Sequence, residues 1–122
     1  MDNKKLLLTD LCPRLPYGVK MNHIADNEVS PVTLIGIIED YIVLQGGGYS
    51  YVPVEHYRSY LFPMSSMTEE QKKEWQSLMA QDSYGILYHT IESYDYLNKN
   101  HFDYRGLIEK ELTIDATGLN IY

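Results

Sequence analysis

The sequence predicts an α+β domain in which a small bent antiparallel sheet precedes two or three helices. Before about residue 65, short runs of β-branched and aromatic residues alternate with turn residues, whereas helix-forming residues dominate afterwards. The length of 122 residues suits a single domain. We expect residues 1–64 to be mainly β, residues 65–112 mainly α, and residues 113–122 to form a loose tail.

The first half begins with a short helical turn at residues 6–11, which Pro13 ends. A turn at residues 14–18 follows, because two prolines fix the backbone there and Gly18 permits unusual backbone angles. Alternating apolar and polar residues then predict a strand at 19–24.

Residues 32–45 are the most strand-like part of the chain. Two apolar runs flank Glu39 and Asp40, which indicates two antiparallel strands joined by a tight turn. Gly36 inside the first run indicates a bulge or a sharp bend. The remaining predicted elements are a glycine turn at 46–48, a strand at 49–54, a single helical turn at 55–60 and a short strand at 61–64.

This order of strands and turns resembles the small SH3-like barrels, which include the Sm-like group. Short strands curl into a barrel only where bends interrupt them, and Gly36 and the turn at 55–60 stand where bends are needed. The alternative is a bent sheet that stays open. In either case the residues expected to face the interior are Val19, Leu34, Ile37, Ile42, Leu44 and Val52.

The second half starts with a helix-capping signal. Thr68 and Gln71 have the spacing of a capping box, in which each side chain bonds to the backbone N–H of the other residue. Asp103 is placed to cap a last short helix. The predicted helices cover residues 68–80, 86–99 and 104–112.

The charge balance disfavours nucleic-acid binding. The net charge is −7, and residues 61–122 contain 10 Asp and Glu against 5 Lys and Arg. A surface that binds phosphates needs clustered Lys and Arg, and the sequence has no such cluster. The single cysteine, Cys12, cannot form an internal disulfide, and no apolar run has the length of a secretion signal or a membrane span. We therefore expect a cytoplasmic protein without membrane attachment.

No sequence pattern is typical of a catalytic, metal or cofactor site. The four histidines have no metal-binding spacing, and Cys12 has no CxxC partner. The glycines at 46–48 lack the Lys and Ser or Thr of a phosphate-binding loop, and no GxSxG elbow occurs. We expect no catalytic residue, no metal and no cofactor.

Three short segments, at residues 13–17, 57–63 and 101–105, place an arginine beside aromatic residues. Arginine and tyrosine dominate binding hot spots, and this chain has 12 tyrosines. Each arginine can instead fasten its own turn, as we expect for Arg105 with Tyr104, whereas we expect Arg58 to lie on a contact surface. The candidate binding residues are Arg14, Tyr17, Tyr57, Arg58, Tyr60, Tyr104 and Arg105.

Three segments carry a family resemblance: LCPRLPYGVK at 11–20, SYLFPMSSMTEEQKKEW at 59–75 and HFDYRGLIEKELTIDATGLNIY at 101–122. They cover about 40% of the chain and resemble a family of short proteins from gut Bacteroidetes and their phages or prophages. A glycine would be usual where Glu111 stands. The resemblance implies a phage or mobile-element setting, and it implies no activity and no catalytic residue.

These observations favour a non-enzymatic protein-interaction module, with a protein as its partner. One alternative is a nucleic-acid-associated accessory protein with an Sm-like barrel, which requires a basic patch. The other is a small-ligand-binding protein, which requires a pocket with convergent polar groups. The identity of the partner and the oligomeric state are left open.

Overall fold

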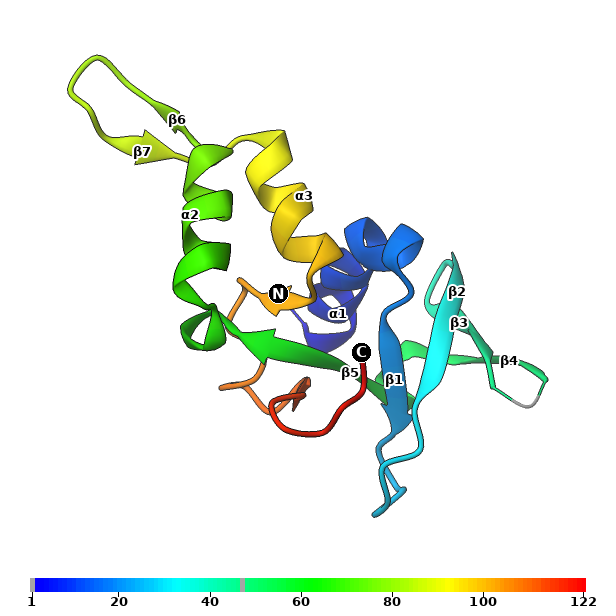
Figure 1. The fold of residues 1–122 in the computed structure, drawn as a ribbon. Coiled ribbons are helices and arrows are strands. Elements are labelled where there is room, and N and C mark those ends of the chain that lie inside the picture. The colour runs from blue at the N-terminus through cyan, green and yellow to red at the C-terminus, as the bar shows by residue number, and fades with distance from the viewer. Residues whose placement is uncertain (1, 47) are drawn as a thin grey trace.

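The computed structural model describes residues 2–46 and 48–122, and within them it shows one mostly antiparallel sheet, three α-helices and a separate hairpin (Figure 1). This arrangement confirms the predicted α+β class. In the part of the chain that is described, no helix combines the length and the hydropathy needed to cross a membrane.

The sheet is built from five consecutive strands and two later additions. The five strands pair antiparallel, as the sequence predicts for this region, and their order in the sheet is β4-β3-β2-β1-β5. They are β1 (Lys20–His23), β2 (Val32–Ile38), β3 (Tyr41–Gln45), β4 (Tyr49–Pro53) and β5 (Tyr57–Pro63). Two short strands, β8 (Phe102–Asp103) and β9 (Ile114–Asp115), pair parallel to β5. The described strands at the two ends, β4 and β8, do not pair with each other, so the described strands form the open sheet and not the closed barrel of the two predicted alternatives.

The irregularity of β2 and the turn after it lie where the sequence places them. The register between β2 and β3 shifts between Leu34 and Gly36, which confirms the predicted irregularity. Glu39 takes a left-handed backbone angle, with φ of 53°, in the tight turn between these strands. Gly46 follows β3, and a Cβ atom there would lie 2.4 Å from Cγ1 of Val32, so only glycine fits. The middle glycine of the predicted turn, Gly47, lies outside the described residues.

The predicted helical turn at 55–60 is wrong. A 3-10 turn covers only Val54–His56, and β5 begins directly after it at Tyr57. This strand is an inner strand, since β1 pairs with it on one side and β8 and β9 pair with it on the other. Pairing on both sides outweighs the weak local preference of this segment for a turn.

The main core lies between the sheet and the first helix. Four of the six residues predicted to face the interior are fully buried, and the other two, Ile37 and Val52, are half-buried against them. The buried four are Val19, Leu34, Ile42 and Leu44. Helix α1 (Asn3–Leu11) covers them with Leu7 and Leu11. This helix starts earlier than the predicted turn at 6–11, because the side chain of Asp2 caps it by accepting from the N–H of Lys5.

Helix α2 (Glu69–Ser77) has the predicted capping box. The Gln71 N–H donates to Thr68 Oγ1 at 3.1 Å, and the Thr68 N–H donates to Gln71 Oε1 at 2.9 Å. The predicted second helix at 86–99 begins later than expected, because Thr90 caps helix α3 (Ile91–Lys99) through the N–H of Ser93. A hairpin of β6 (Ala80–Gln81) and β7 (Leu87–Tyr88) occupies the residues before it.

The predicted third helix at 104–112 is wrong, although its cap is present. The Asp103 carboxylate accepts from the N–H groups of Leu107 at 3.0 Å and Ile108 at 2.9 Å. The segment after it forms turns, because Gly106 with φ of 72° and Glu111 with φ of 59° leave the right-handed helical region.

The tail at 113–122 is docked rather than loose. It adds strand β9 to β5, and the Ala116 N–H donates to the Leu61 carbonyl at 2.9 Å. The Tyr122 hydroxyl donates to the Tyr60 carbonyl at 2.7 Å and accepts from the Lys20 N–H at 2.9 Å. The final residues therefore hold β5 and β1 together.

Candidate functional site

Arg14 lies in the interior and not on a contact surface. The 3-10 turn Cys12–Tyr17 follows α1 and brings Arg14 one helical turn past Asp10. Arg14 Nε and Nη2 each lie 3.1 Å from a carboxylate oxygen of Asp10, and Nη2 also donates to the Phe102 carbonyl at 2.7 Å. Arg14 is 0% exposed and Asp10 is 1% exposed. Arg14 therefore joins α1 to β8, and its burial corrects the prediction that it contacts a partner.

Tyr104 and Arg105 extend this ion pair towards the surface. Arg105 Nε donates to Asp10 Oδ1 at 3.2 Å, so one buried carboxylate serves two arginines. Both guanidinium groups lie near the Tyr104 ring, whose centroid is 5.1 Å from Arg14 Cζ and 5.0 Å from Arg105 Cζ. Its hydroxyl donates to Asn98 Oδ1 of α3 at 2.9 Å. These contacts hold the turn that contains Tyr104 and Arg105 in place.

A shallow hollow of about 390 Å³ lies over this cluster. Its lining residues are Pro13, Tyr94, Asn98, Tyr104 and Arg105. The Tyr94 ring lies 5.3 Å from that of Tyr104 and 4.5 Å from that of His89, measured between centroids. An aromatic row thus connects the arginine cluster to the segment that follows β7.

The expected contact surface around Arg58 is present only in part. Arg58 is exposed on β5, and Tyr57 beside it is half-buried with its ring edge-on to His23 at 5.1 Å. Tyr60 is 1% exposed, because β5 is an inner strand and not the end of an edge strand. Its ring is therefore out of reach of a partner, and burial raises the pKa of its phenol.

Tyr17 fastens the first 3-10 turn to α3. Its hydroxyl donates to the Asp95 carboxylate, which raises the pKa of the Tyr17 phenol because the bond favours the protonated form. Of the seven candidate binding residues, the structure brings Arg14, Tyr104 and Arg105 into one cluster. The other four lie outside this cluster.

The sequence reasoning missed the β6–β7 hairpin, which is the most prominent surface feature. It projects from the ends of α2 and α3, away from the sheet (Figure 1). We call residues 80–91 the hairpin arm. Its large apolar side chains are exposed: Tyr84 at 89%, Ile86 at 63%, Leu87 at 42%, Tyr88 at 51% and Ile91 at 85%.

The loop of the hairpin arm is held by Asp82. Its carboxylate accepts from the N–H groups of Tyr84 and Ile86, both at 2.9 Å, and its N–H donates to the Ile86 carbonyl at 3.0 Å. Gly85 takes a φ of 80°, which suits glycine in a turn. An aspartate followed three residues later by a glycine is typical of a tight turn, so this signal was available in the sequence.

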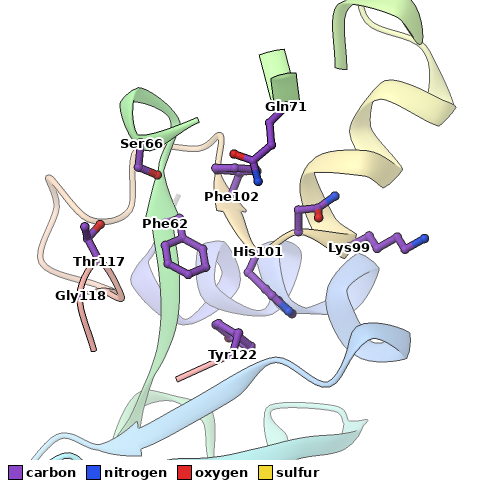
Figure 2. Close-up of a pocket in the computed structure, with 10 residues that line it drawn as sticks. Phe62, Ser66, Gln71, Lys99, His101, Phe102, Thr117, Gly118 and Tyr122 are labelled. Atoms are coloured by element: carbon purple, nitrogen blue, oxygen red, sulfur yellow. The ribbon is translucent and has the colours of Figure 1, made fainter. Parts of the chain in front are cut away.

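A second and larger hollow, of about 510 Å³, lies beside β5 and is lined in part by the tail (Figure 2). Six segments meet there: β5, the 3-10 turn Met64–Ser66, the first turn of α2, the end of α3, β8 and the tail. Its aromatic wall consists of Phe62, Phe102, His101 and Tyr122.

His101 lines this hollow with an unusual backbone and a shifted pKa. It has a left-handed φ of 63°, and its ring stacks on Tyr122 with centroids 3.6 Å apart. Its Nδ1 atom is buried and has no hydrogen-bond partner among the described residues. Burial, aided by the charge of Arg14, lowers the pKa of His101 to about 4, so the imidazole is neutral at pH 7.

No group of three or more His, Cys, Asp and Glu side chains is placed to hold a metal ion within residues 2–46 and 48–122. Comparisons with models of protein families, with curated protein sequences and with solved structures return no match to this chain. The resemblance to the Bacteroidetes and phage family stays a prediction. Function is therefore inferred from the surfaces described above.

Proposed function

We propose that this protein is a non-enzymatic protein-interaction module that binds its partner through the hairpin arm. The observation that supports this function is the exposure of five large apolar side chains within eight residues, Tyr84 to Ile91. Single exposed apolar residues are normal, but a contiguous group marks an interaction site. Two of the five are tyrosines, which are enriched among the residues that dominate binding energy.

The arm is ready to bind without a large loss of conformational entropy. The three bonds of Asp82 fix the loop, and the base is fixed by Thr90, whose hydroxyl donates to the Leu78 carbonyl. A preordered loop retains more of its contact energy as affinity.

The charge around the arm indicates the chemistry of the partner. Residues 74–98 contain Glu74, Asp82, Glu92 and Asp95, and they contain no Lys or Arg. A second copy of this chain would bring like charges together, and a nucleic acid would be repelled. The partner is therefore a different protein, with an apolar groove that basic residues surround.

The sheet supports the SH3-like assignment as part of this proposal. Its first five strands follow the expected order, a 3-10 turn separates β4 from β5, and β5 returns beside β1. Such a scaffold serves here as a base for the helices and the arm, and the phage or mobile-element setting stays a prediction.

Site-specific photo-cross-linking in cells that express the protein tests this function. A benzophenone side chain at Tyr84 should give a defined adduct that survives nuclease treatment. The same group at Tyr51, which is 57% exposed on β4, should not give it. Equal yields of the adduct from both positions would indicate non-specific cross-linking and would contradict the proposal.

The cross-linked protein should then be purified and titrated against defined variants. The double variant Tyr84→Ser/Ile86→Ser should weaken binding by at least about 30-fold, as expected for the loss of hot-spot residues. The matched variant Tyr51→Ser/Ile38→Ser changes a tyrosine and an isoleucine that are exposed on the sheet, and it should leave the Kd within about twofold. An unchanged Kd in the arm variant would refute the assignment.

A further inference from the structure

The hollow of Figure 2 has the features of a small-molecule site that is separate from the hairpin arm. Its volume of about 510 Å³ lies in the range of ligand pockets, which are mostly apolar with a few polar groups. The ring centroids of Phe62 and Phe102 lie 6.3 Å apart, and those of Phe62 and Tyr122 lie 5.9 Å apart, so these side chains form one continuous aromatic wall. Such a wall suits a planar aromatic compound, because aromatic rings attract one another by stacking or by edge-to-face contact.

The interior of the hollow carries no formal charge. None of the described Asp and Glu residues lines it, and the one charged residue among the described lining, Lys99, extends away from Phe62 (Figure 2). His101 is neutral at pH 7 for the reason given above. A neutral ligand is therefore favoured over an anion or a cation.

Two amide side chains line the hollow, and backbone groups fix the orientation of both. Gln71 uses its Oε1 to accept from the Thr68 N–H at 2.9 Å, so its Nε2 donor has no partner among the described residues. Asn100 uses its Nδ2 to donate to the Tyr96 carbonyl at 2.9 Å, so its Oδ1 acceptor is free there too. The hollow thus offers one amide donor and one amide acceptor.

We propose that this hollow binds a small, neutral, planar aromatic lactam. Its ring lies against Phe62 and Tyr122, its carbonyl accepts from Gln71 Nε2, and its N–H donates to Asn100 Oδ1. Oxo-substituted pyrimidine, purine and quinazoline rings belong to this class. The site is built by α2, α3, β5, β8 and the tail, and it does not depend on the function proposed for the arm.

The capping box allows a sharp test. Gln71→Glu keeps an acceptor for the Thr68 N–H, and glutamate suits this position of a capping box. The same change replaces the free donor with a second acceptor. The matched control is Gln76→Glu, which adds the same charge to an exposed position of α2 outside the hollow.

The probe is 4(3H)-quinazolinone, titrated into each 15N-labelled variant while amide chemical shifts are recorded. We expect saturable shifts at residues 62, 71, 99–102 and 117–118 in the wild type and in Gln76→Glu. Gln71→Glu should bind at least about tenfold more weakly, because a carbonyl then faces a carboxylate. Quinazoline, which lacks the lactam, should bind Gln71→Glu and the wild type within about twofold of each other.

A second variant tests the location by steric exclusion. Thr117 is exposed at the edge of the hollow, so Thr117→Trp should leave the circular dichroism spectrum unchanged and should abolish the shifts from both compounds. Three results would overturn the proposal: no saturation up to about 5 mM probe, shifts that map to residues 80–91, or equal weakening by Gln71→Glu and Gln76→Glu.

Discussion

Replacement of Arg14 by methionine should be one of the most destabilising single changes in this protein. Arg14 and Asp10 are fully buried, and the change removes the two bonds of 3.1 Å to the carboxylate and the bond of 2.7 Å to Phe102. Asp10 keeps only the contact of 3.2 Å with Arg105, whose side chain is 30% exposed. Removal of one partner of a buried ion pair typically lowers the free energy of unfolding by about 3–5 kcal/mol.

A loss of this size is a large part of the stability of a domain, which is about 5–15 kcal/mol. For a chain of this length it should lower the Tm by about 12–20 °C. Urea denaturation of Arg14→Met measures the loss directly. Arg58→Met is the control, because this exposed arginine has no bond that the structure shows, and its loss should change stability by less than about 0.5 kcal/mol.

The double variant Asp10→Leu/Arg14→Met tests the cause of the loss. It removes the stranded charge together with its partner, so it should be more stable than Arg14→Met alone. The reasoning is refuted if Arg14→Met costs less than about 1 kcal/mol, or if the double variant is no more stable than the single one.

Three further predictions concern stability. Thr68→Ala should cost about 1 kcal/mol in urea denaturation because one bond of the capping box is lost, and no change would contradict the cap. Arg105→Ala should lower the free energy of unfolding by about 1–2 kcal/mol, whereas Arg58→Ala should leave the melting temperature unchanged. The reverse order of melting temperatures would contradict the structural role of Arg105 and the surface role of Arg58. For His101, the unfolded chain binds a proton near its ordinary pKa of 6.5 and the folded protein only near pH 4. Its contribution is therefore complete above pH 6.5 and falls between pH 6.5 and pH 4 by at most about 3 kcal/mol, because solvent screening reduces the full effect, and His101→Asn should not show this loss.

The sheet and its bends could be predicted because they depend on local patterns. The apolar runs around Glu39 and Asp40, the bulge before Gly36 and the cap at Thr68 all follow from residues close together in sequence. The last segment of the sheet was mispredicted at Tyr57, because its strand structure depends on partners from β1 and the tail.

The candidate site was harder to predict, because burial decides the role of each arginine. Nothing in residues 13–17 distinguishes a buried Arg14 from an exposed one, and the carbonyl of Phe102 that it contacts is 88 residues away. The arm was missed because a helical pattern was extended across residues 86–90, although Asp82, Gly85 and Thr90 carried the signals of a turn and a later helix start.

The position of β5 has a consequence for how the chain folds. One side of this strand pairs with β1, which lies 34 to 38 residues earlier in the chain, and the other side is covered by residues such as Thr113, whose hydroxyl bonds to Ser59 across 54 residues of sequence. Contacts of such long range form late, since the intervening chain must first be brought together. An intermediate with the first five strands formed would therefore display a bare strand edge at β5, which is the kind of surface that recruits other chains into aggregates. The tail must therefore pair with β5 quickly if the protein is to refold without aggregation at high protein concentration.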